Sequence, residues 1–590
     1  MSAPQQKIMV ELDLGRYELR VAGKVVQLER IPMKLLILLV ENQDKLVSRE
    51  AIIEHLWGRD VFLDAEQGIN TAIRKVRMAL CDDSEKPRFL QTVVGKGYRF
   101  VGPVSVVDRA IPAEGLSTAR PAIRSIAVLP LRNLSAASND EYFADGMTDE
   151  LITCIARTCS LRVTSYTSVT RYKGSNRSLP QIARELQVDA VIEGSVMRSG
   201  EEARITAQLI HAARDEHLWA EEYQRPLRDI LGLQREVAVE IAHQVRAALV
   251  SPARGAVPTG MVDPTAYDFY LRGRSYWNQR SEAAIHKAIE QFNKAIEIDP
   301  GYGSAWSGMA DCYTTLGYLG YSSPLDTFPR AYQAATKALT RDPSLSEAHA
   351  SLAYYYLYHG WDWAAAEREF ETAIELNPNY AMAHDWYSYF LLAMGRTDEA
   401  WKKIIRAREL DPLSVLISTD VGFNLYYHPD YDGAISQLRS TLEINPNFYL
   451  ARLWIGRSYQ QKGMFAEAIE EFEKADEALP DWIVTVAAMG NAYGEWGKRI
   501  EAERILQRLE RLSRQKFVTH YGVALVHSAL GDKDRAFEWL HRGYEGRSHW
   551  LVWLGRDPRW KQIRSDPRFA ELTKRVGLPD TATKNQGEIR

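Results

Sequence analysis

Residues 69–100 read INTAIRKVRMALCDDSEKPRFLQTVVGKGYRF. In the first part of this stretch, residues 69–80, apolar residues recur at helical spacing and predict an amphipathic helix. These apolar residues are Ile69, Ile73, Val76 and Leu80. In the last part, residues 89–100, apolar and polar residues alternate around Gly95 and Gly97, which predicts a β-hairpin. The stretch therefore specifies a helix that is followed by a two-stranded hairpin.

The residues before this stretch predict strands first and helices second. Three short segments with apolar–polar alternation, at residues 8–14, 17–21 and 24–28, are typical of β-strands. Pro32 is a favourable first residue for a helix that runs to Glu41. Ser48 can cap a second helix, which we expect to stop at Gly58. Residues 1–103 thus predict a small α+β domain.

Basic residues are concentrated in two acid-free segments of this domain, residues 70–80 and 86–99. They are Arg74, Lys75, Arg77, Lys86, Arg88, Lys96 and Arg99. A helix that is apolar on one face and basic on the other fits the DNA major groove, which is about 12 Å wide. Lys96 at the hairpin turn can reach phosphates or the neighbouring minor groove. The basic charge of these residues by itself is also consistent with an ordinary helix face that is exposed to solvent.

Three segments in this order resemble the OmpR/PhoB-type winged-helix DNA-binding domain: VSREAIIEHLWG (47–58), INTAIRKVRMAL (69–80) and PRFLQTVVGKGYRF (87–100). The resemblance implies that residues 70–80 form the recognition helix and that the hairpin is the wing. The DNA-binding residues that it implies are Trp57, Asn70, Thr71, Arg74, Lys75, Arg77, Thr92, Lys96 and Arg99. Ala72 and Val94 depart from the residues that are common in the family at these positions, so the base preference stays open.

Residues 125–250 alternate between strand-like and helix-like segments and predict an α/β domain. The segments SIAVLPLRNLS, YFADGMTDELI and IARELQVDAVIEGSVMRSG resemble the TolB-amino-terminal-like (FlgO-like) domain. The resemblance implies an interaction or relay module, which passes on a signal or joins copies of the chain. Asp145, Asp149 and Glu150 are interpreted as a polar helix start, since carboxylates are favoured near the positive end of the helix dipole.

Residues 262–545 repeat. Prolines at positions 300, 343, 378, 412, 446 and 480 are separated by 43, 35, 34, 34 and 34 residues. A 34-residue period with a helix-terminating proline is the signature of tetratricopeptide helix pairs. In the best-matching unit, Gly456 and Ala468 permit close helix approach, and Phe472 fills the space beside them. Thirteen of the 15 tryptophans follow residue 270, so most aromatic residues are expected to pack between repeats.

Composition excludes several classes of protein. The net charge of −4 argues against a uniformly basic nucleic-acid coat protein, although residues 1–103 alone carry 16 basic and 14 acidic residues. The four cysteines form no CxxC pair, and we expect reduced thiols. We find no signal peptide, no run of about 20 apolar residues and no nucleotide-binding or hydrolase motif. We therefore expect a cytoplasmic protein that is no enzyme, with no cofactor, no metal site and no membrane segment.

The sequence thus predicts a multidomain chain: a winged helix (α+β), an α/β TolB-N-like domain and an all-α tetratricopeptide solenoid. The expected divisions are a DNA-binding domain at 1–103, a linker at 104–124, the α/β domain at 125–250, a linker at 251–261, the solenoid at 262–545, a capping segment at 546–578 and a disordered tail at 579–590.

Two hypotheses from different functional classes remain. The first is a one-component transcriptional regulator that binds promoter DNA and whose solenoid binds a protein or peptide. Only seven residues precede the first strand, so we expect no receiver domain there. RNA polymerase and a second copy of the chain are further candidate partners. The alternative is a tetratricopeptide scaffold whose winged helix contacts protein.

Overall fold

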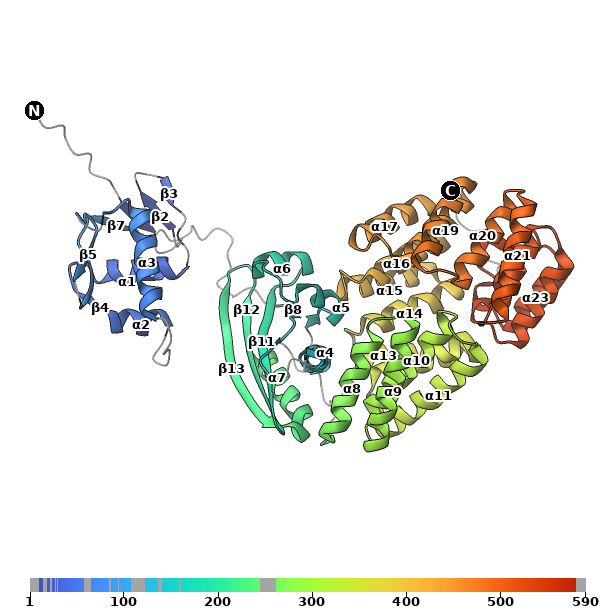
Figure 1. Cartoon of the computed structure of the whole chain (residues 1–590), viewed down its shortest axis with the longest axis horizontal. Coiled ribbons are helices and arrows are strands. Elements are labelled where there is room, and N and C mark those ends of the chain that lie inside the picture. The colour runs from blue at the N-terminus through green and yellow to red at the C-terminus, as the bar shows by residue number, and fades with distance from the viewer. Residues whose placement is uncertain are drawn as a thin grey trace, which may run out of the picture. The chain divides into compact units, whose positions relative to one another are not determined.

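The structure of the protein is a computed structural model. It describes residues 10–13, 18–21, 24–26, 28, 30–57, 65–83, 86–93, 95–107, 123–135, 141–158, 161–244 and 261–579. The expected tail beyond residue 579 and most of the two expected linkers lie outside these residues. The chain divides into two compact units, Met1–Arg120 and Pro121–Arg590. Figure 1 shows the helices and strands of both units.

The first unit is the winged helix that the sequence predicts. Its elements are β1 (Val10–Asp13), β2 (Glu18–Val21), β3 (Lys24–Val26), α1 (Arg30–Glu41), β4 (Val47–Ser48), α2 (Arg49–Trp57), α3 (Ala65–Leu80), β5 (Leu90–Val93), β6 (Gly97–Phe100) and β7 (Val104–Val107). One sheet has the order β3-β2-β1-β7, and the wing sheet has the order β4-β6-β5. The three helices pack together between these sheets around buried Leu35, Leu39, Ile52 and Phe100.

Strand β7 differs from the expectation for its residues. Val104–Val107 were expected to begin a linker, because Ala, Pro and Ser follow them. In the structure they pair in parallel with β1, with Val104 opposite Val10. The pairing satisfies the backbone groups on this side of β1, which would otherwise be a sheet edge. The ordered domain therefore extends past residue 103.

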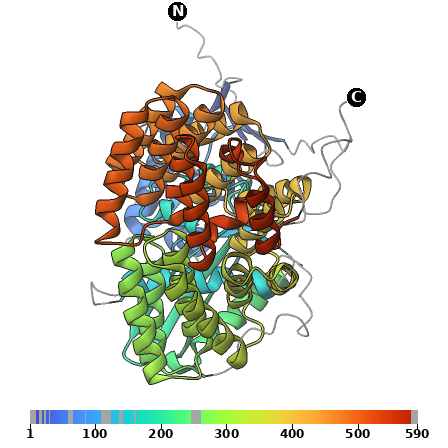
Figure 2. The ribbon, with the colours of Figure 1, turned by 90° about the vertical axis from the view of Figure 1, so that its right-hand side faces the viewer.

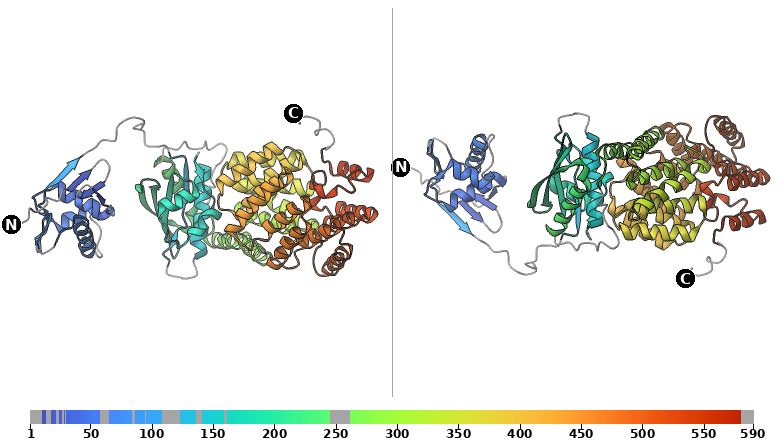
Figure 3. Two further views of the ribbon diagram at one scale, coloured as in Figure 1. Left: turned by 90° about the horizontal axis from the view of Figure 1, so that it is seen from above. Right: turned by 90° about the horizontal axis from the view of Figure 1, so that it is seen from below.

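The second unit begins with an α/β domain. Its elements are β8 (Ser125–Val128), β9 (Arg132–Asn133), α4 (Glu141–Thr158), β10 (Arg162–Val163), α5 (Tyr166–Val169), α6 (Leu179–Leu186), β11 (Ala190–Ser199), β12 (Glu202–His211), β13 (Glu216–Pro226) and α7 (Ile230–Gln244). The sheet order is β10-β8-β11-β12-β13, and β9 also pairs with β11. Helices α4 and α7 lie on the face of the sheet that is turned toward the solenoid (Figure 3).

Eight helix pairs then form the solenoid. They are α8 (Pro264–Trp277) and α9 (Glu282–Ile298), α10 (Gly303–Tyr318) and α11 (Pro324–Arg341), α12 (Ser346–Tyr355) and α13 (Trp363–Leu376), α14 (Ala381–Ala393) and α15 (Thr397–Leu410), α16 (Val415–Tyr427) and α17 (Tyr431–Ile444), α18 (Tyr449–Gln461) and α19 (Phe465–Ala478), α20 (Ile483–Glu495) and α21 (Arg499–Ser513), and α22 (His520–Ala529) and α23 (Lys533–Glu545).

The repeated Asp-Pro and Asn-Pro steps end helices in the way that the sequence predicts. Asp299 and Asn377 are the residues directly after α9 and α13. Their side-chain oxygens accept hydrogen bonds from the backbone N–H two residues later, at 2.9 and 3.1 Å. This local bond turns the chain away from the helix toward the next repeat. Gly456 permits the close helix approach that the sequence predicts. A Cβ at this position would lie 2.5 Å from the Phe472 ring, so a larger residue would push the two helices apart.

The last segment of the chain covers the inner helices of the solenoid. It comprises the 3₁₀ turns η4 (His549–Trp553) and η5 (Pro558–Trp560) and helix α24 (Pro567–Val576). The ring of Trp553, which is fully buried, stacks on Tyr427 at 4.7 Å and meets Phe423 edge-on at 5.1 Å. The indole of Trp482 donates to the carbonyl of Leu319, 163 residues earlier. The array therefore curves back toward its own start (Figure 2).

The α/β domain contacts the helix-ending turns of the solenoid. The Ser168 hydroxyl donates to the Asp411 carboxylate at 2.5 Å and accepts from the Leu413 N–H at 2.8 Å. The Asn379 amide donates to the Leu161 carbonyl at 2.7 Å. Two consecutive repeat turns thus bind β10, α5 and the residues beside them. These bonds explain why residues 125–250 and the solenoid form one compact unit, although the sequence separates them by a linker.

Helix α4 forms the second part of this contact, with α12 through Glu347 and with α8 through Tyr270 and Arg274. Arg157 pairs with Glu347 at 2.5 Å, and Arg274 pairs with Asp149 at 3.2 Å. The Tyr270 hydroxyl donates to the Glu150 carboxyl at 2.5 Å. Burial raises the pKa of Glu150 to about 7, because the loss of water outweighs the hydrogen bond from Tyr270 and the nearby arginines.

We predict that Glu150→Gln makes the second unit more stable above pH 7. The folded state binds this proton more tightly than the unfolded state, whose pKa is near 4.5. The resulting stabilisation is fully present below about pH 4.5 and is lost as the pH rises through about 7. A neutral amide should add at most about 3 kcal/mol to the free energy of unfolding at pH 8.

Chemical denaturation of the intact chain at several pH values measures this effect. Glu297→Gln, on the exposed side of α9, is the matched control and should leave the pH dependence unchanged. Parallel pH profiles for wild type and Glu150→Gln would contradict the assignment.

Candidate nucleic-acid interface

Helix α3 separates its apolar and polar residues onto opposite faces. The apolar residues predicted from the helical spacing, from Ile69 to Leu80, are all buried in the domain core. Asn70, Thr71 and Arg74 are exposed on the other side, and Lys75 is partly exposed. Because one face packs on α1 and α2, the helix presents the other to any ligand. The structure thus brings four of the predicted DNA-binding residues onto one surface.

Met78 belongs to the same surface, although the sequence analysis did not select it. Its side chain is 72% exposed, more than most apolar residues of the described chain. Its position four residues after Arg74 places it one turn further along the same face. An exposed apolar side chain beside basic ones suits contact with a thymine methyl group. Spacing alone could have identified it, since position 78 falls outside the buried stripe.

Arg77 lies differently from the expectation. The residue is only 8% exposed, and its guanidinium donates to the Asp83 carbonyl at 3.1 Å and to the Thr92 hydroxyl at 2.9 Å. The Asp82 carboxylate is 3.9 Å away. The predicted contact of Arg77 with DNA is therefore corrected: its side chain is directed inward and holds the end of α3 to β5. Thr92, also a predicted contact, accepts one of these bonds.

Asp82 fixes the connection between the recognition helix and the wing. Its carboxylate accepts hydrogen bonds from the backbone N–H groups of Arg88, Phe89 and Leu90, at 2.6, 3.2 and 2.9 Å. Asp side chains commonly form such bonds to nearby backbone. No local sequence pattern indicates this role for Asp82. The three bonds set where β5 begins and therefore where the wing stands relative to α3.

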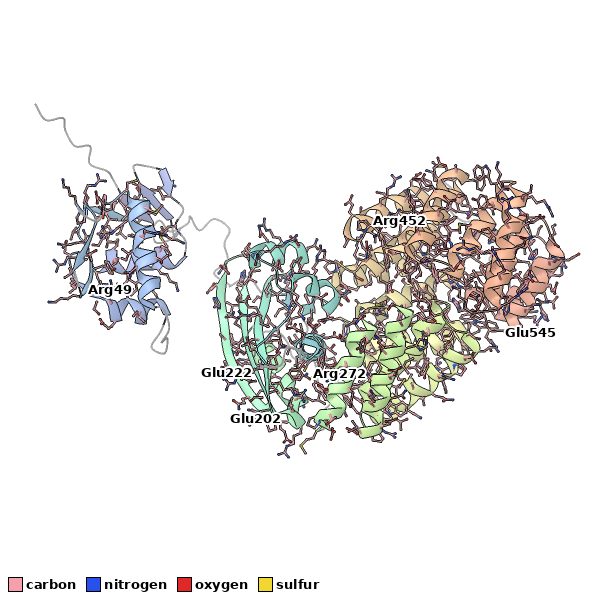
Figure 4. All side chains as sticks on the ribbon, viewed as in Figure 1. Arg49, Glu202, Glu222, Arg272, Arg452 and Glu545 are labelled. Carbon is pink, nitrogen blue, oxygen red and sulfur yellow. The ribbon has the colours of Figure 1, made fainter. Side chains whose placement is uncertain are left out.

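The Asn70 side chain is oriented by two neighbours. Its carbonyl oxygen accepts from Arg49 at 3.3 Å and from the Tyr98 hydroxyl at 3.2 Å. Arg49 also donates to the Tyr98 hydroxyl at 3.1 Å, which links α2, α3 and β6. The amide NH₂ of Asn70 is then the group directed to an outside acceptor. Arg49, labelled in Figure 4, is a basic residue of this surface that the sequence analysis did not select.

The wing is a tight hairpin. Gly95 has a φ of +71°, and Lys96 is exposed beside it at the turn. Gly97 allows β6 to approach β4, since a Cβ there would lie 2.1 Å from the Val47 carbonyl oxygen. Arg99 lies on β6 and is partly buried. Trp57 is the last residue of α2, but its side chain lies outside the described residues, as does Val94.

Within the described ranges, no three His, Cys, Asp or Glu side chains gather as metal ligands would. None of the described helices combines the length and apolar character that crossing a lipid bilayer requires.

Family models match all three regions of the chain. Residues 23–100 match the model described as transcriptional regulatory protein, C terminal, and residues 122–239 match HilA/YgeH-like transcriptional regulator, second domain. Residues 369–402 and 428–489 match tetratricopeptide repeat models. The resemblances to a winged-helix DNA-binding domain and to tetratricopeptide repeats are thereby confirmed. The middle region, which resembles TolB-amino-terminal-like domains, falls within a model of regulator domains.

Two relatives and one solved structure illustrate the range of similarity. The transcriptional regulator HilA of Salmonella typhi is 22% identical over 568 residues, which cover 94% of this chain and 96% of HilA. Putative adenylate cyclase 3 of Rhizobium meliloti (strain 1021) is 35% identical over 236 residues, only 40% of either protein. The Klebsiella pneumoniae RstA DNA-binding domain, solved with the RstA box, is 24% identical and covers 15% of this chain and 88% of its own, with a TM-score of 0.15.

The chain is therefore a transcriptional regulator with an OmpR-type DNA-binding domain and tetratricopeptide repeats. Its middle region is a HilA-like regulator domain. The match to HilA of Salmonella typhi covers 94% of the chain and so includes all three regions.

We predict that substitution of Arg77 lowers the stability of the first unit, whereas substitution of Arg74 on the exposed face of α3 leaves it almost unchanged. Arg77→Met should lower the free energy of unfolding of the first unit by about 1–3 kcal/mol, because Thr92 and the Asp83 carbonyl lose their partner. Arg74→Met, on the exposed face of the same helix, should change it by less than about 0.5 kcal/mol. Amide hydrogen exchange of β5 in the intact chain measures the difference. Equal protection of the β5 amides from exchange in the two variants would show that Arg77 does not stabilise the contact between α3 and β5.

Proposed function

We propose that the chain binds specific promoter DNA through its winged helix. Helix α3 lies in the major groove, where Asn70, Thr71, Arg74 and Lys75 contact base edges and phosphates. Lys96 and Arg99 of the wing reach the adjacent backbone or minor groove, and Trp57 and Thr92 lie against phosphates. The observation that carries the proposal is the exposed polar and basic face of α3 beside an exposed wing lysine.

The solenoid is proposed to bind a protein or peptide partner, with RNA polymerase as one candidate. Its inner helices already contact η4, and two repeat turns already contact the α/β domain. The partner therefore uses solenoid surface outside these internal contacts. A regulator of this design acts on the chromosome, so we place it in the cytoplasm.

A scaffold whose winged helix contacts protein is the second candidate, because Met78 exposes apolar surface on α3. Salt separates the two functions. Each phosphate that the protein neutralises releases counterions, so DNA affinity falls steeply as salt rises, whereas apolar protein contact does not.

We predict a steep salt dependence for binding to DNA from upstream of the chain's own gene. Lys96→Ala should weaken binding about equally on all sequences and reduce the slope of log affinity against log salt by about 1. Arg74→Met should relax sequence preference and cost about 1–3 kcal/mol on the preferred site. Fluorescence anisotropy at two or more salt concentrations measures both quantities.

Lys402→Ala, an exposed lysine on α15, serves as the control and should bind DNA as the wild type does. A salt-independent affinity, or no preference over unrelated DNA, would favour the scaffold instead.

The proposal includes no catalytic step. The cyclase relative matches over 40% of its own length, so its named activity is not transferred to this chain. We predict that the intact protein forms no cyclic AMP from ATP and Mg²⁺. Product formation above a no-protein blank, measured by chromatography, would contradict this part of the proposal.

A further inference from the structure

Strand β13 is an open edge of the α/β sheet. It is 11 residues long, and among the described strands it pairs only with β12 (Figure 1). The opposite edge, β10, has two residues and is covered by the solenoid: Arg162 donates to the Glu409 carbonyl at 2.7 Å, and Val163 donates to Asn379 at 3.3 Å. An exposed strand edge is a template for pairing with another chain. One edge of this sheet is therefore closed internally and the other is available.

The backbone of β13 shows which groups face outward. Leu227 donates its N–H to the Glu201 carbonyl at 2.7 Å, which continues the β12–β13 register. Hydrogen-bonded pairs in an antiparallel ladder recur at every second residue. Residues 221, 223 and 225 therefore direct their N–H and C=O groups toward β12. Residues 220, 222 and 224 direct their N–H and C=O groups outward, away from β12. Pro226 directs its C=O outward and has no N–H.

A second copy of β13 can pair with these outward groups in several registers, and side-chain charge distinguishes them. With Tyr223 on the two-fold axis, outward residues meet outward residues, and Glu222 lies opposite Gln224. Glu221 then lies opposite Arg225 of the second copy, twice over. Registers centred on Glu221, Glu222 or Arg225 place a charge opposite its own kind, which is destabilising. Registers centred on Ala220 or Gln224 avoid like charges but pair no opposite charges within the strand, so charge favours the axis at Tyr223.

The side chains near this axis already have suitable positions. The Tyr223 hydroxyl donates to Glu221 at 3.0 Å. Arg225 pairs with Glu236 of α7 at 2.8 Å, with both side chains more than 40% exposed, so this pair contributes little and can be shared. On the same side, Tyr223 and Val239 of α7 border a hollow of about 400 Å³. Val239 is 38% exposed, so apolar surface also lies beside the axis.

The opposite side of the strand offers only polar contacts within its own sheet. Arg204 lies 3.5 Å from Glu222, and Gln224 donates to Glu202 at 2.5 Å (Figure 4). These pairs cross from β12 to β13 and leave the outer edge unobstructed.

We propose that two copies of this chain dimerise by antiparallel pairing of β13 around a two-fold axis at Tyr223. The proposal rests on the proposed function in one respect: a winged helix reads few base pairs, and pairing two modules on repeated sites increases specificity. The contact itself is derived from the sheet edge and its charges.

Charge reversal tests the register in the intact chain. Arg225→Glu and Glu221→Arg each create two like-charge contacts across the axis and should raise the dimer dissociation constant at least about tenfold. An equimolar mixture of the two variants restores both ion pairs, so it should form heterodimers with near wild-type affinity. Arg214→Glu, in the exposed turn between β12 and β13, is the control and should dimerise as the wild type does.

Sedimentation velocity without DNA measures the mass of each sample over a range of concentrations. Gln224→Pro is an independent variant, because it removes an outward N–H and leaves the β12 ladder intact; it should also weaken the dimer. A monomeric wild type, single variants that dimerise as the wild type does, a mixture that remains monomeric, or a Gln224→Pro chain with unchanged affinity would each overturn the proposal. Since DNA is absent, failure here leaves DNA binding untouched. A dimer that does not bind DNA would instead refute the proposed function.

Discussion

A helix pair of the solenoid can bury its apolar face only against the next pair, so an array of pairs always leaves surfaces that need cover. In this protein the chain itself supplies that cover. The last segment places Trp553 against Phe423 and Tyr427 on the inner helices. The α/β domain places Ser168 on Asp411 at a repeat turn. Together with the contacts of α4 with α8 and α12, these two contacts make the second unit one body, and they determine which of its surfaces remain open.

The same constraint explains the position of the open strand. The sheet of the α/β domain is covered by α4 and α7 on one face, and its short edge lies on the solenoid. The long edge, β13, is what remains. In the first unit, the surface of α3 that stays open is likewise the one that internal packing leaves uncovered. One face of the helix is used by the core, and Arg77 holds its end to the wing, so Asn70 and Arg74 are presented at a set angle to the hairpin.

Much of this arrangement could be predicted from local sequence. The helical spacing of Ile69 and Ile73 identified the buried face of α3, and the 34-residue period identified the repeats. Such patterns are local, and packing in the structure follows them. The role of Arg77 could not be predicted, because a long basic side chain can point outward or inward, and the decision depends on Thr92, 15 residues away.

Contacts between segments that are distant in the sequence could not be predicted from local patterns either. The Asp411-Pro412 step was recognised as a helix stop, but nothing near it in the sequence indicates Ser168, 243 residues earlier. Val104–Val107 look like a linker and yet form a strand, because β1 offers an unpaired side. Residues whose role is set by the rest of the fold, such as Asp82, are therefore the ones that the sequence analysis missed.

Genome-wide DNA occupancy of the intact protein, compared with that of Arg74→Met, tests the central claim most directly. The account predicts discrete sites upstream of genes, which share a paired sequence motif and are lost in the variant. Absence of site enrichment for the wild type, or identical sites for both proteins, would contradict it.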